Sequence, residues 1–201
     1  MNYSAHAVRS ARFAGMAIIA IFSLSILAAL QFYPGSYSPY TNWISDLGNP
    51  AMNPSGAAFL NAGFVLEGIL FIPFCLGLYR WHGHGRGGSL TFTMSAFSGF
   101  VAALSLVMIG IFPENYAASH TFWAVTFFGS MGFFLLLSSV HLLYCGESDS
   151  FAKRISYFGF LAFAADAAFA LAFYDPTFEW GAAIASFVYV ALLSYAMIRK
   201  S

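Results

Sequence analysis

Six continuous apolar runs, each about as long as a helix that crosses a bilayer, constrain this chain more than any other feature. They lie at about 11–33, 56–79, 91–112, 121–144, 155–174 and 181–198. A spanning helix needs about 20 apolar residues. The strands of a membrane barrel are short and alternate in polarity, whereas these runs are continuous. The sequence therefore predicts an all-α integral membrane protein, with six transmembrane helices arranged as three hairpins in one domain over residues 1–201.

The composition agrees with a membrane protein. Hydrophobic residues make up 60% of the chain and charged residues 8%, whereas soluble domains are usually about a quarter charged. The formal net charge is zero, so nothing points to a nucleic-acid partner. The expected partners are membrane lipids, and a membrane-protein partner or a second copy of the chain remains open.

The basic residues predict the orientation of the six spans. Every Lys and Arg lies at a terminus or in the connection after the second or fourth run: Arg9, Arg12, Arg80, Arg86, Lys153, Arg154, Arg199 and Lys200. Because short cytoplasmic loops carry the excess of Lys and Arg, both termini are expected to be cytoplasmic. The other three connections carry only acids, namely Asp46, Glu114, Asp175 and Glu179.

The first outer connection is the longest and the most polar. A long loop in a compact bundle is usually functional or partly inserted. Tyr40, Trp43, Ile44 and Leu47 recur in it at helical spacing. This spacing predicts a short amphipathic helix lying at the membrane interface.

Polar residues from three segments are expected to meet over the outer mouth of the bundle. The set comprises Asn42, Ser45 and Asp46 from the first outer connection, Asn61 from the second span, and Glu114 and His120 from the second outer connection. Such groups could hold a lipid headgroup or perform acid–base chemistry. The alternative is ordinary loop polarity with Asp46 or Ser45 as a helix cap. Capping does not explain Asn61, which lies inside the membrane boundary.

Two acids fall near the middle of spans. Glu67 lies in the second span and Asp166 in the fifth. Charged carboxylates are costly at that depth, so these residues are functional candidates and suggest a proton-coupled small-molecule transporter. The alternative is two neutral acids that join helices by hydrogen bonds.

Three histidines are weaker candidates for a metal or haem site. His82 and His84 lie in a glycine-rich inner connection, and His141 lies near the inner end of the fourth span. Histidine nitrogens bind zinc and haem iron, but a flexible loop positions them poorly. A basic loop at anionic headgroups is the simpler interpretation, and no cofactor is firmly predicted.

Several of these motifs together resemble a known family. The stretches "NWISDLGNP", Phe59 to Gly63 and "GIFPEN", with His120 following, are similar to bacterial and archaeal membrane proteins grouped as domain-of-unknown-function family 998. The resemblance implies a six-span protein of a prokaryotic cell membrane, but no reaction. Its signature residues would be Asn42, Ser45, Asp46, Gly48, Asn61, Phe112, Pro113 and His120.

A more distant likeness is to membrane hydrolases that include the alkaline ceramidases, which have a Ser, an Asp and three His around a zinc near one membrane face. Ser45, Asp46 and His120 match only part of that set, and no second outer histidine exists. A metal-dependent hydrolase using His120, Asp46 and Glu114 is therefore one hypothesis. Others are a lipid-binding or small-molecule-binding protein and a non-enzymatic subunit of a membrane complex, so enzyme activity stays open.

Overall fold

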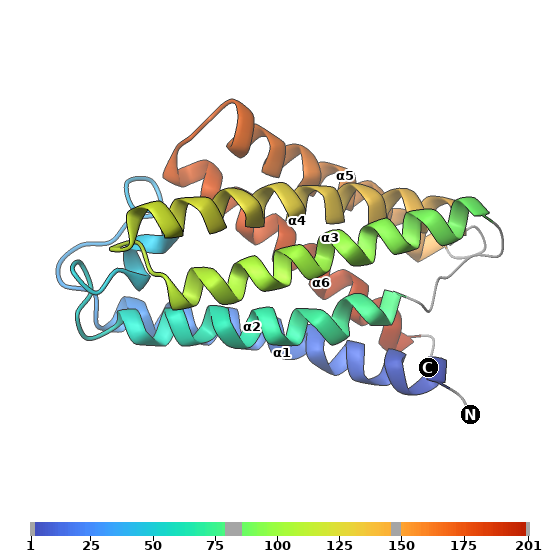
Figure 1. Ribbon diagram of the computed structural model, residues 1–201, viewed down its shortest axis with the longest axis horizontal. Coiled ribbons are helices and arrows are strands. Elements are labelled where there is room, and N and C mark those ends of the chain that lie inside the picture. Colours follow the sequence, from blue (N-terminus) through green and yellow to red (C-terminus); the bar gives the residue numbers. More distant parts are fainter. Residues whose placement is uncertain (1–2, 79–85, 146–149, 200–201) are drawn as a thin grey trace.

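The computed structural model describes residues 3–78, 86–145 and 150–199, and they are helical apart from connections (Figure 1). The elements are α1 (Tyr3–Gln31), the 3-10 helix η1 (Ile44–Gly48), α2 (Ala57–Gly77), α3 (Arg86–Ile111), α4 (Ala117–Cys145), α5 (Ser150–Leu171) and α6 (Pro176–Arg199). Each helix contains a long run of apolar residues. Within the described residues, six helices are long and apolar enough to cross a membrane, which confirms the predicted fold class.

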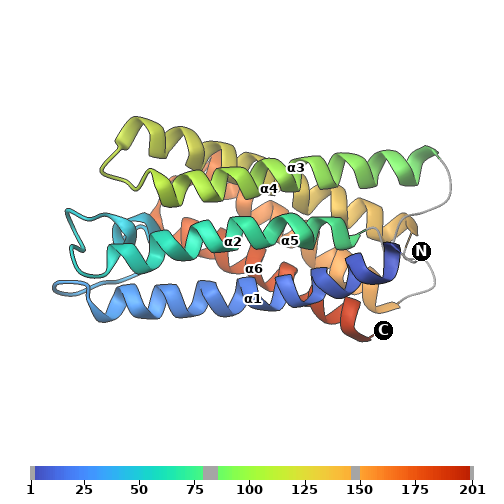
Figure 2. The same ribbon diagram turned by 60° about the horizontal axis from the view of Figure 1, so that its bottom comes forward.

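The long helices form a ring in chain order. Each packs against its neighbours in the sequence, and α6 closes the ring against α1. Figures 1 and 2 show the helices side by side along the long axis, with both termini at one end. We call the opposite end, which holds η1 and the 112–116 and 172–175 connections, the η1 end. Because the helices alternate in direction, connections far apart in the sequence meet there.

Side chains that face outward are largely apolar, as expected for helices in lipid. Leu24, Phe97 and Leu161 are each more than three-fifths exposed. Two buried clusters fill the interior. One lies in the half towards the termini, and the other, which includes Phe22, Leu47 and Leu60, lies in the half towards η1.

The interfacial helix expected in the first loop is not confirmed. The structure has a five-residue 3-10 helix there, and its Ile44, Asp46, Leu47 and Gly48 are buried. Ile44 and Leu47 pack into the η1-end cluster between the long helices, while Tyr40 is 76% exposed. The apolar spacing thus reflects insertion into the end of the bundle, because the ring leaves an apolar opening there that these side chains fill.

Two glycines let α2 and α3 approach closely, as small residues do between membrane helices. A Cβ on Gly68 would lie 2.5 Å from the Ala103 carbonyl oxygen, and a Cβ on Gly110 would lie 2.5 Å from the Asn61 carbonyl oxygen. Both obstacles are backbone atoms, which a rotamer change cannot move.

We expect Gly68→Ala to force α2 and α3 apart and to destabilise the protein by about 1–3 kcal/mol, the usual cost of overpacking. The matched control is Gly181→Ala on α6, where a Cβ meets nothing within 4 Å. This control should be neutral or slightly stabilising, since alanine favours a helix. Thermal loss of helical circular dichroism in detergent measures both variants, and equal melting temperatures would contradict the close packing.

A candidate pocket at the η1 end

A buried asparagine holds the end of the first loop against α1. Asn53 is fully buried, and its Nδ2 donates to the carbonyl oxygens of Ala29 at 3.0 Å and Leu47 at 2.9 Å. Its Oδ1 accepts the Gly56 N–H at 3.1 Å. Non-helical backbone among apolar helices must have its polar groups satisfied by other parts of the protein. Asn53 does this for three backbone groups at once.

Two further amides tie the loop to α2 and to the connection between α3 and α4. Asn61 Nδ2 donates to the Gly48 carbonyl oxygen at 2.9 Å, and a Cβ on Gly48 would come within 2.5 Å of Asn61 Oδ1. Asn49 Nδ2 donates to Glu114 Oε2 at 3.0 Å. The end of η1 is therefore held from both of its neighbouring elements.

The first turn of α6 holds the start of η1. Glu179 Oε2 accepts the Ile44 N–H at 2.7 Å, and Trp180 Nε1 donates to the Asn42 carbonyl oxygen at 3.2 Å. Two consecutive residues of the last helix thus bond to backbone in the first loop. This contact closes the ring of helices at the η1 end.

Asp46 orders the loop from within. Its Oδ2 accepts the Trp43 N–H at 3.0 Å and an Asn42 Nδ2–H at 3.1 Å. A carboxylate that bonds to the backbone N–H three residues earlier caps the beginning of a helix. The contacts of Asp46 are therefore those of a residue that caps a helix.

Burial and the acids at the η1 end raise the pKa of two nearby tyrosines. Burial raises the pKa of Tyr37, and the nearby Glu179 and Asp46 raise it further. Burial also raises the pKa of Tyr33, with smaller contributions from Asp46 and Glu114. Both phenols therefore stay neutral to higher pH than free tyrosine, and Tyr37 donates its O–H to the Trp43 carbonyl oxygen at 2.8 Å.

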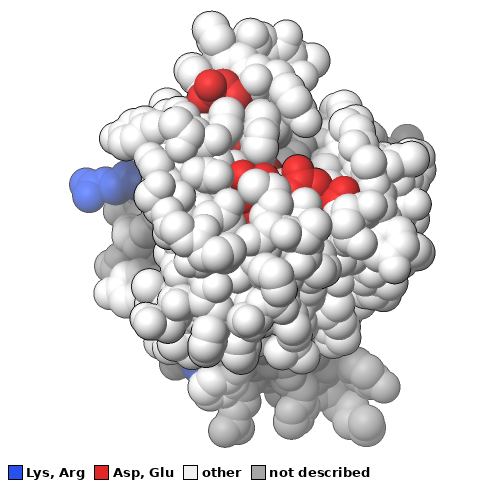
Figure 3. Space-filling model, turned by 90° about the vertical axis from the view of Figure 1, so that its left-hand side faces the viewer, with Lys and Arg blue, Asp and Glu red and all other residues white. Residues whose placement is uncertain are grey.

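Beside η1 lies a pocket of about 480 Å³, which we call the α4–α5 pocket. Its polar lining comes from Ser45, Glu114, His120, Thr121 and Glu179, and its aromatic lining from Trp43, Phe128, Phe169 and Tyr174. Among the residues that the structure describes, none of those lining it is Lys or Arg. Figure 3 views the η1 end and shows acidic side chains gathered near its centre.

The rings form a connected wall. The ring centroids of Trp43 and Tyr174 are 4.8 Å apart, and those of Phe128 and Phe169 are 4.6 Å apart. Phe169 also stacks on Tyr174, with centroids 5.8 Å apart. The pocket is therefore lined by a connected set of aromatic rings as well as by acids.

The pocket also reaches the lipid-facing surface. Val125 of α4 and Leu171 of α5 line it and are 67% and 87% exposed. Figure 1 shows α5 and its connection to α6 rising away from α4 at this end. An occupant could therefore place a polar group inside and extend an apolar group sideways between the two helices.

The six residues predicted for an outer pocket divide into two groups. Ser45, Glu114 and His120 line the α4–α5 pocket, whereas Asn42, Asp46 and Asn61 bond within the loop or to it. His120 Nδ1 lies 3.0 Å from the Phe112 carbonyl oxygen. Since a carbonyl only accepts, Nδ1 carries a proton, and in neutral His120 the Nε2 atom is an acceptor.

Glu179, Trp43 and Asn53 have roles that the sequence reasoning did not assign. In the sequence, Glu179 marks only the topology of the chain. Acids are common in the first turn of a helix, so its position there does not single it out. No local pattern distinguishes Asn53, whose three partners lie in separate segments.

The two intramembrane acids lie at similar depth but are not hydrogen-bonded to each other. Glu67 is fully buried and shares a cavity with Met131 of α4, and within the described part of the chain its two oxygens have no hydrogen-bond partner. Asp166 packs on the next residue of α4, since a Cβ on Gly132 would lie 2.5 Å from Asp166 Oδ2. The two acids thus pack beside different residues of α4.

The structure gathers no metal-ligand set among the described residues. No three His, Cys, Asp or Glu side chains in that part of the chain are placed to hold a metal ion. Asp46 bonds within the loop and does not line the pocket with His120 and Glu114, so the hydrolase ligand set is not assembled. His141 is buried, with Nδ1 3.1 Å from the Thr91 hydroxyl. His82 and His84 lie outside the described residues.

The fold and the pocket define a class of protein: a six-helix bundle of membrane type with a polar pocket at one end. A family model described as "Protein of unknown function (DUF998)" matches residues 16–198, and the chain belongs to this family. Neither the curated proteins nor the solved structures include a match. Hydrogen bonds join six of the eight residues that carried the family resemblance in pairs: Asn42 with Asp46, Gly48 with Asn61, and Phe112 with His120.

We expect Asn53→Ala to destabilise the protein by about 2–4 kcal/mol, because it removes three hydrogen bonds of a buried side chain, including the bond to the Leu47 carbonyl oxygen. Hydrogen exchange of the backbone over residues 44–56 should also accelerate. Asn115→Ala is the control, since Asn115 is exposed in the neighbouring connection. Similar exchange and melting in both variants would show that Asn53 does not hold the loop.

Proposed function

We propose that this protein binds an amphiphile with an amine-bearing head in the α4–α5 pocket. The observation that carries the proposal is the pocket itself, which combines a polar, acid-lined interior with an apolar, exposed rim. Its volume of about 480 Å³ falls within the range of about 300–1,000 Å³ typical of small-molecule sites.

The lining favours a positive charge on the head. Glu114 and Glu179 contribute acidic groups, and the aromatic wall around Trp43 presents ring faces. Cations are attracted to aromatic faces, most strongly to tryptophan. A primary or quaternary ammonium group therefore matches the pocket better than a phosphate alone, which would face acids without a basic partner.

The rim supports a lipid-like tail. Val125 and Leu171 flank the opening and face the surface where acyl chains would lie. A chain leaving the pocket there remains in an apolar environment. A fully polar solute would leave this part of the pocket unmatched.

Native mass spectrometry tests the binding with phosphatidylethanolamine and phosphatidylglycerol of identical acyl chains. We expect the ethanolamine lipid to be retained and the glycerol lipid to be retained more weakly. Glu114→Gln should reduce this difference, because it removes an acid from the lining. Retention of neither lipid would contradict the proposed function, whereas equal retention of both would contradict only the amine-bearing head.

Filling the pocket gives a sharper test. A Cβ on Gly129 meets nothing within 4 Å, and Gly129 lines the pocket. Gly129→Leu should therefore weaken lipid retention about tenfold or more, equivalent to at least 1.4 kcal/mol. Gly181→Leu adds the same side chain at an open site that does not line the pocket, and it should bind as the wild type does. Equal binding by the two variants would contradict the assigned site.

We further propose that the η1 end faces outward from a prokaryotic cell membrane and that both termini are cytoplasmic. All eight basic residues lie near the termini of the sequence, or in or beside the connections after the second and fourth apolar runs. This distribution supports the orientation through the positive-inside rule.

Labelling with a membrane-impermeant maleimide tests the orientation. In a Cys75→Ala, Cys145→Ala background, Tyr40→Cys at the η1 end should be labelled in intact cells, because Tyr40 is 76% exposed. Ser150→Cys, an exposed position at the other end, should be labelled only after the membrane is opened. The reverse pattern would invert the proposed topology.

A further inference from the structure

The polar groups that line the α4–α5 pocket divide into those that are already hydrogen-bonded and those left for an occupant. Glu114 Oε2 accepts from Asn49, and Glu179 Oε2 accepts the Ile44 N–H. The second oxygen of each carboxyl has no hydrogen-bond partner among the described residues, and neither has the Ser45 hydroxyl. The pocket therefore retains oxygen atoms that can accept a hydrogen bond from a ligand.

His120 adds an acceptor whose role is set by the other nitrogen of its ring. Nδ1 donates to the Phe112 carbonyl oxygen at 3.0 Å, so in the neutral ring Nε2 carries a lone pair and no proton. Nε2 has no hydrogen-bond partner in the described part of the chain. His120 lines the pocket, whereas Phe112 does not. Nε2 is therefore the ring nitrogen that is available to an occupant, and in the neutral ring it can only accept.

The aromatic rings of the pocket pack against one another. Phe169 stacks on Tyr174 with an angle of 18° between the ring planes, and it meets Phe128 in a T-shaped arrangement at 64°. The Trp43 centroid lies 6.3 Å from that of Phe169 and 4.8 Å from that of Tyr174. Quaternary ammonium groups are typically held in cages of aromatic ring faces. Here the contacts between rings cover part of each ring, which leaves less ring surface for a cation than such a cage offers.

We propose that the α4–α5 pocket selects a primary ammonium group over a quaternary one, and that His120 Nε2 is the acceptor that distinguishes them. This inference rests on the proposed function, because it specifies the head of the same amphiphile. A primary ammonium has three N–H donors for His120, Ser45 and the acids. A trimethylammonium has the same charge but no donor, so it would leave these acceptors unpaired. Sites built to hydrogen-bond an N–H group reject an analogue that lacks it.

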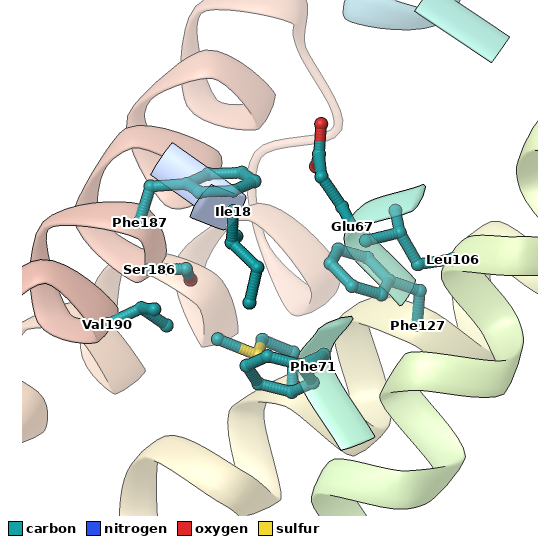
Figure 4. Close-up of a pocket in the computed structure, with 9 residues that line it drawn as sticks. Ile18, Glu67, Phe71, Leu106, Phe127, Ser186, Phe187 and Val190 are labelled. Atoms are coloured by element: carbon teal, nitrogen blue, oxygen red, sulfur yellow. The ribbon is translucent and has the colours of Figure 1, made fainter. Parts of the chain in front are cut away.

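The cavity beside Glu67 does not offer the ammonium group a second site. Its volume is about 20 Å³, which is room for about one water molecule. Figure 4 shows Glu67 together with the apolar side chains that line this cavity, among them Phe71 and Leu106. Glu67 has no exposed surface, so a head group cannot reach its carboxyl. The acids that an ammonium group meets in the α4–α5 pocket are Glu114 and Glu179.

A series of lipids that differ only in methylation of the amine tests the selectivity in the wild-type protein. The series comprises phosphatidylethanolamine, its N-methyl and N,N-dimethyl derivatives, and phosphatidylcholine, all with identical acyl chains. Each methyl group removes one N–H donor and keeps the positive charge. In native mass spectrometry, we expect retention to fall along the series, by about tenfold or more from the first lipid to the last.

The same series separates this inference from the proposed function. Equal retention of all four lipids, above that of phosphatidylglycerol, would overturn the selection of a primary ammonium and leave the amine-bearing head standing. Retention of none of them would contradict the proposed function itself.

Two substitutions of His120 test the acceptor. His120→Phe keeps an aromatic ring and removes Nε2, whereas His120→Asn also removes Nε2 but has an amide N–H that can replace the bond to the Phe112 carbonyl oxygen. In whichever variant melts like the wild type, retention of phosphatidylethanolamine should fall towards that of phosphatidylcholine, which should itself stay unchanged. Tyr116→Phe is the control, because Tyr116 is 55% exposed and does not line the pocket, and it should bind as the wild type does. An undiminished preference in a folded His120 variant would show that head-group size sets the selectivity and would overturn the role of His120.

Discussion

The structure depends on hydrogen bonds that side chains of the long helices and their connections make to the backbone of the first loop. This loop enters the apolar opening at the end of the helix ring, where its N–H and C=O groups would be costly without partners. Asn53, Asn61 and Glu179 supply those partners from within the loop, from α2 and from α6. With the backbone satisfied, Ile44 and Leu47 can fill the opening. The same contacts place Ser45 and Trp43 beside the pocket.

Two acids, Glu114 and Glu179, both hold the loop and line the pocket. Glu114 bonds to Asn49, and Glu179 bonds to the Ile44 N–H, yet both acids line the α4–α5 pocket. A ligand that drew on either acid would compete with a contact that holds the loop. Occupancy of the pocket and order in the loop are therefore linked physically. Glu179 lies in the first turn of α6, so its bond to the Ile44 N–H holds the loop and also closes the ring of helices.

The sequence predicted the spans well and the site only in part. The thickness of the bilayer sets the length of each apolar run, and charged residues mark where a run ends. Run length and charge placement therefore locate the helices. Ser45, Glu114 and His120 lie at one end of the bundle, since alternating helix direction brings their connections together. The spacing of Ile44 and Leu47 is the same in an interfacial helix and in a loop inserted into the bundle. The sequence therefore does not distinguish the two arrangements. The role of Glu179 depends on a bond between residues 135 positions apart, which no local pattern encodes.

By itself, the sequence determined that the chain forms six membrane-length helices. This follows from composition over about 20 residues, the scale on which the bilayer acts as a solvent. The placement of Lys and Arg in the sequence predicts the orientation of these helices. Only the tertiary structure decided which polar residues hold the loop and which line the pocket. It also decided that Glu67 is fully buried while Asp166 packs against Gly132. These outcomes depend on distances between separate helices, and similar side chains at similar depths acquire different surroundings when the ring closes.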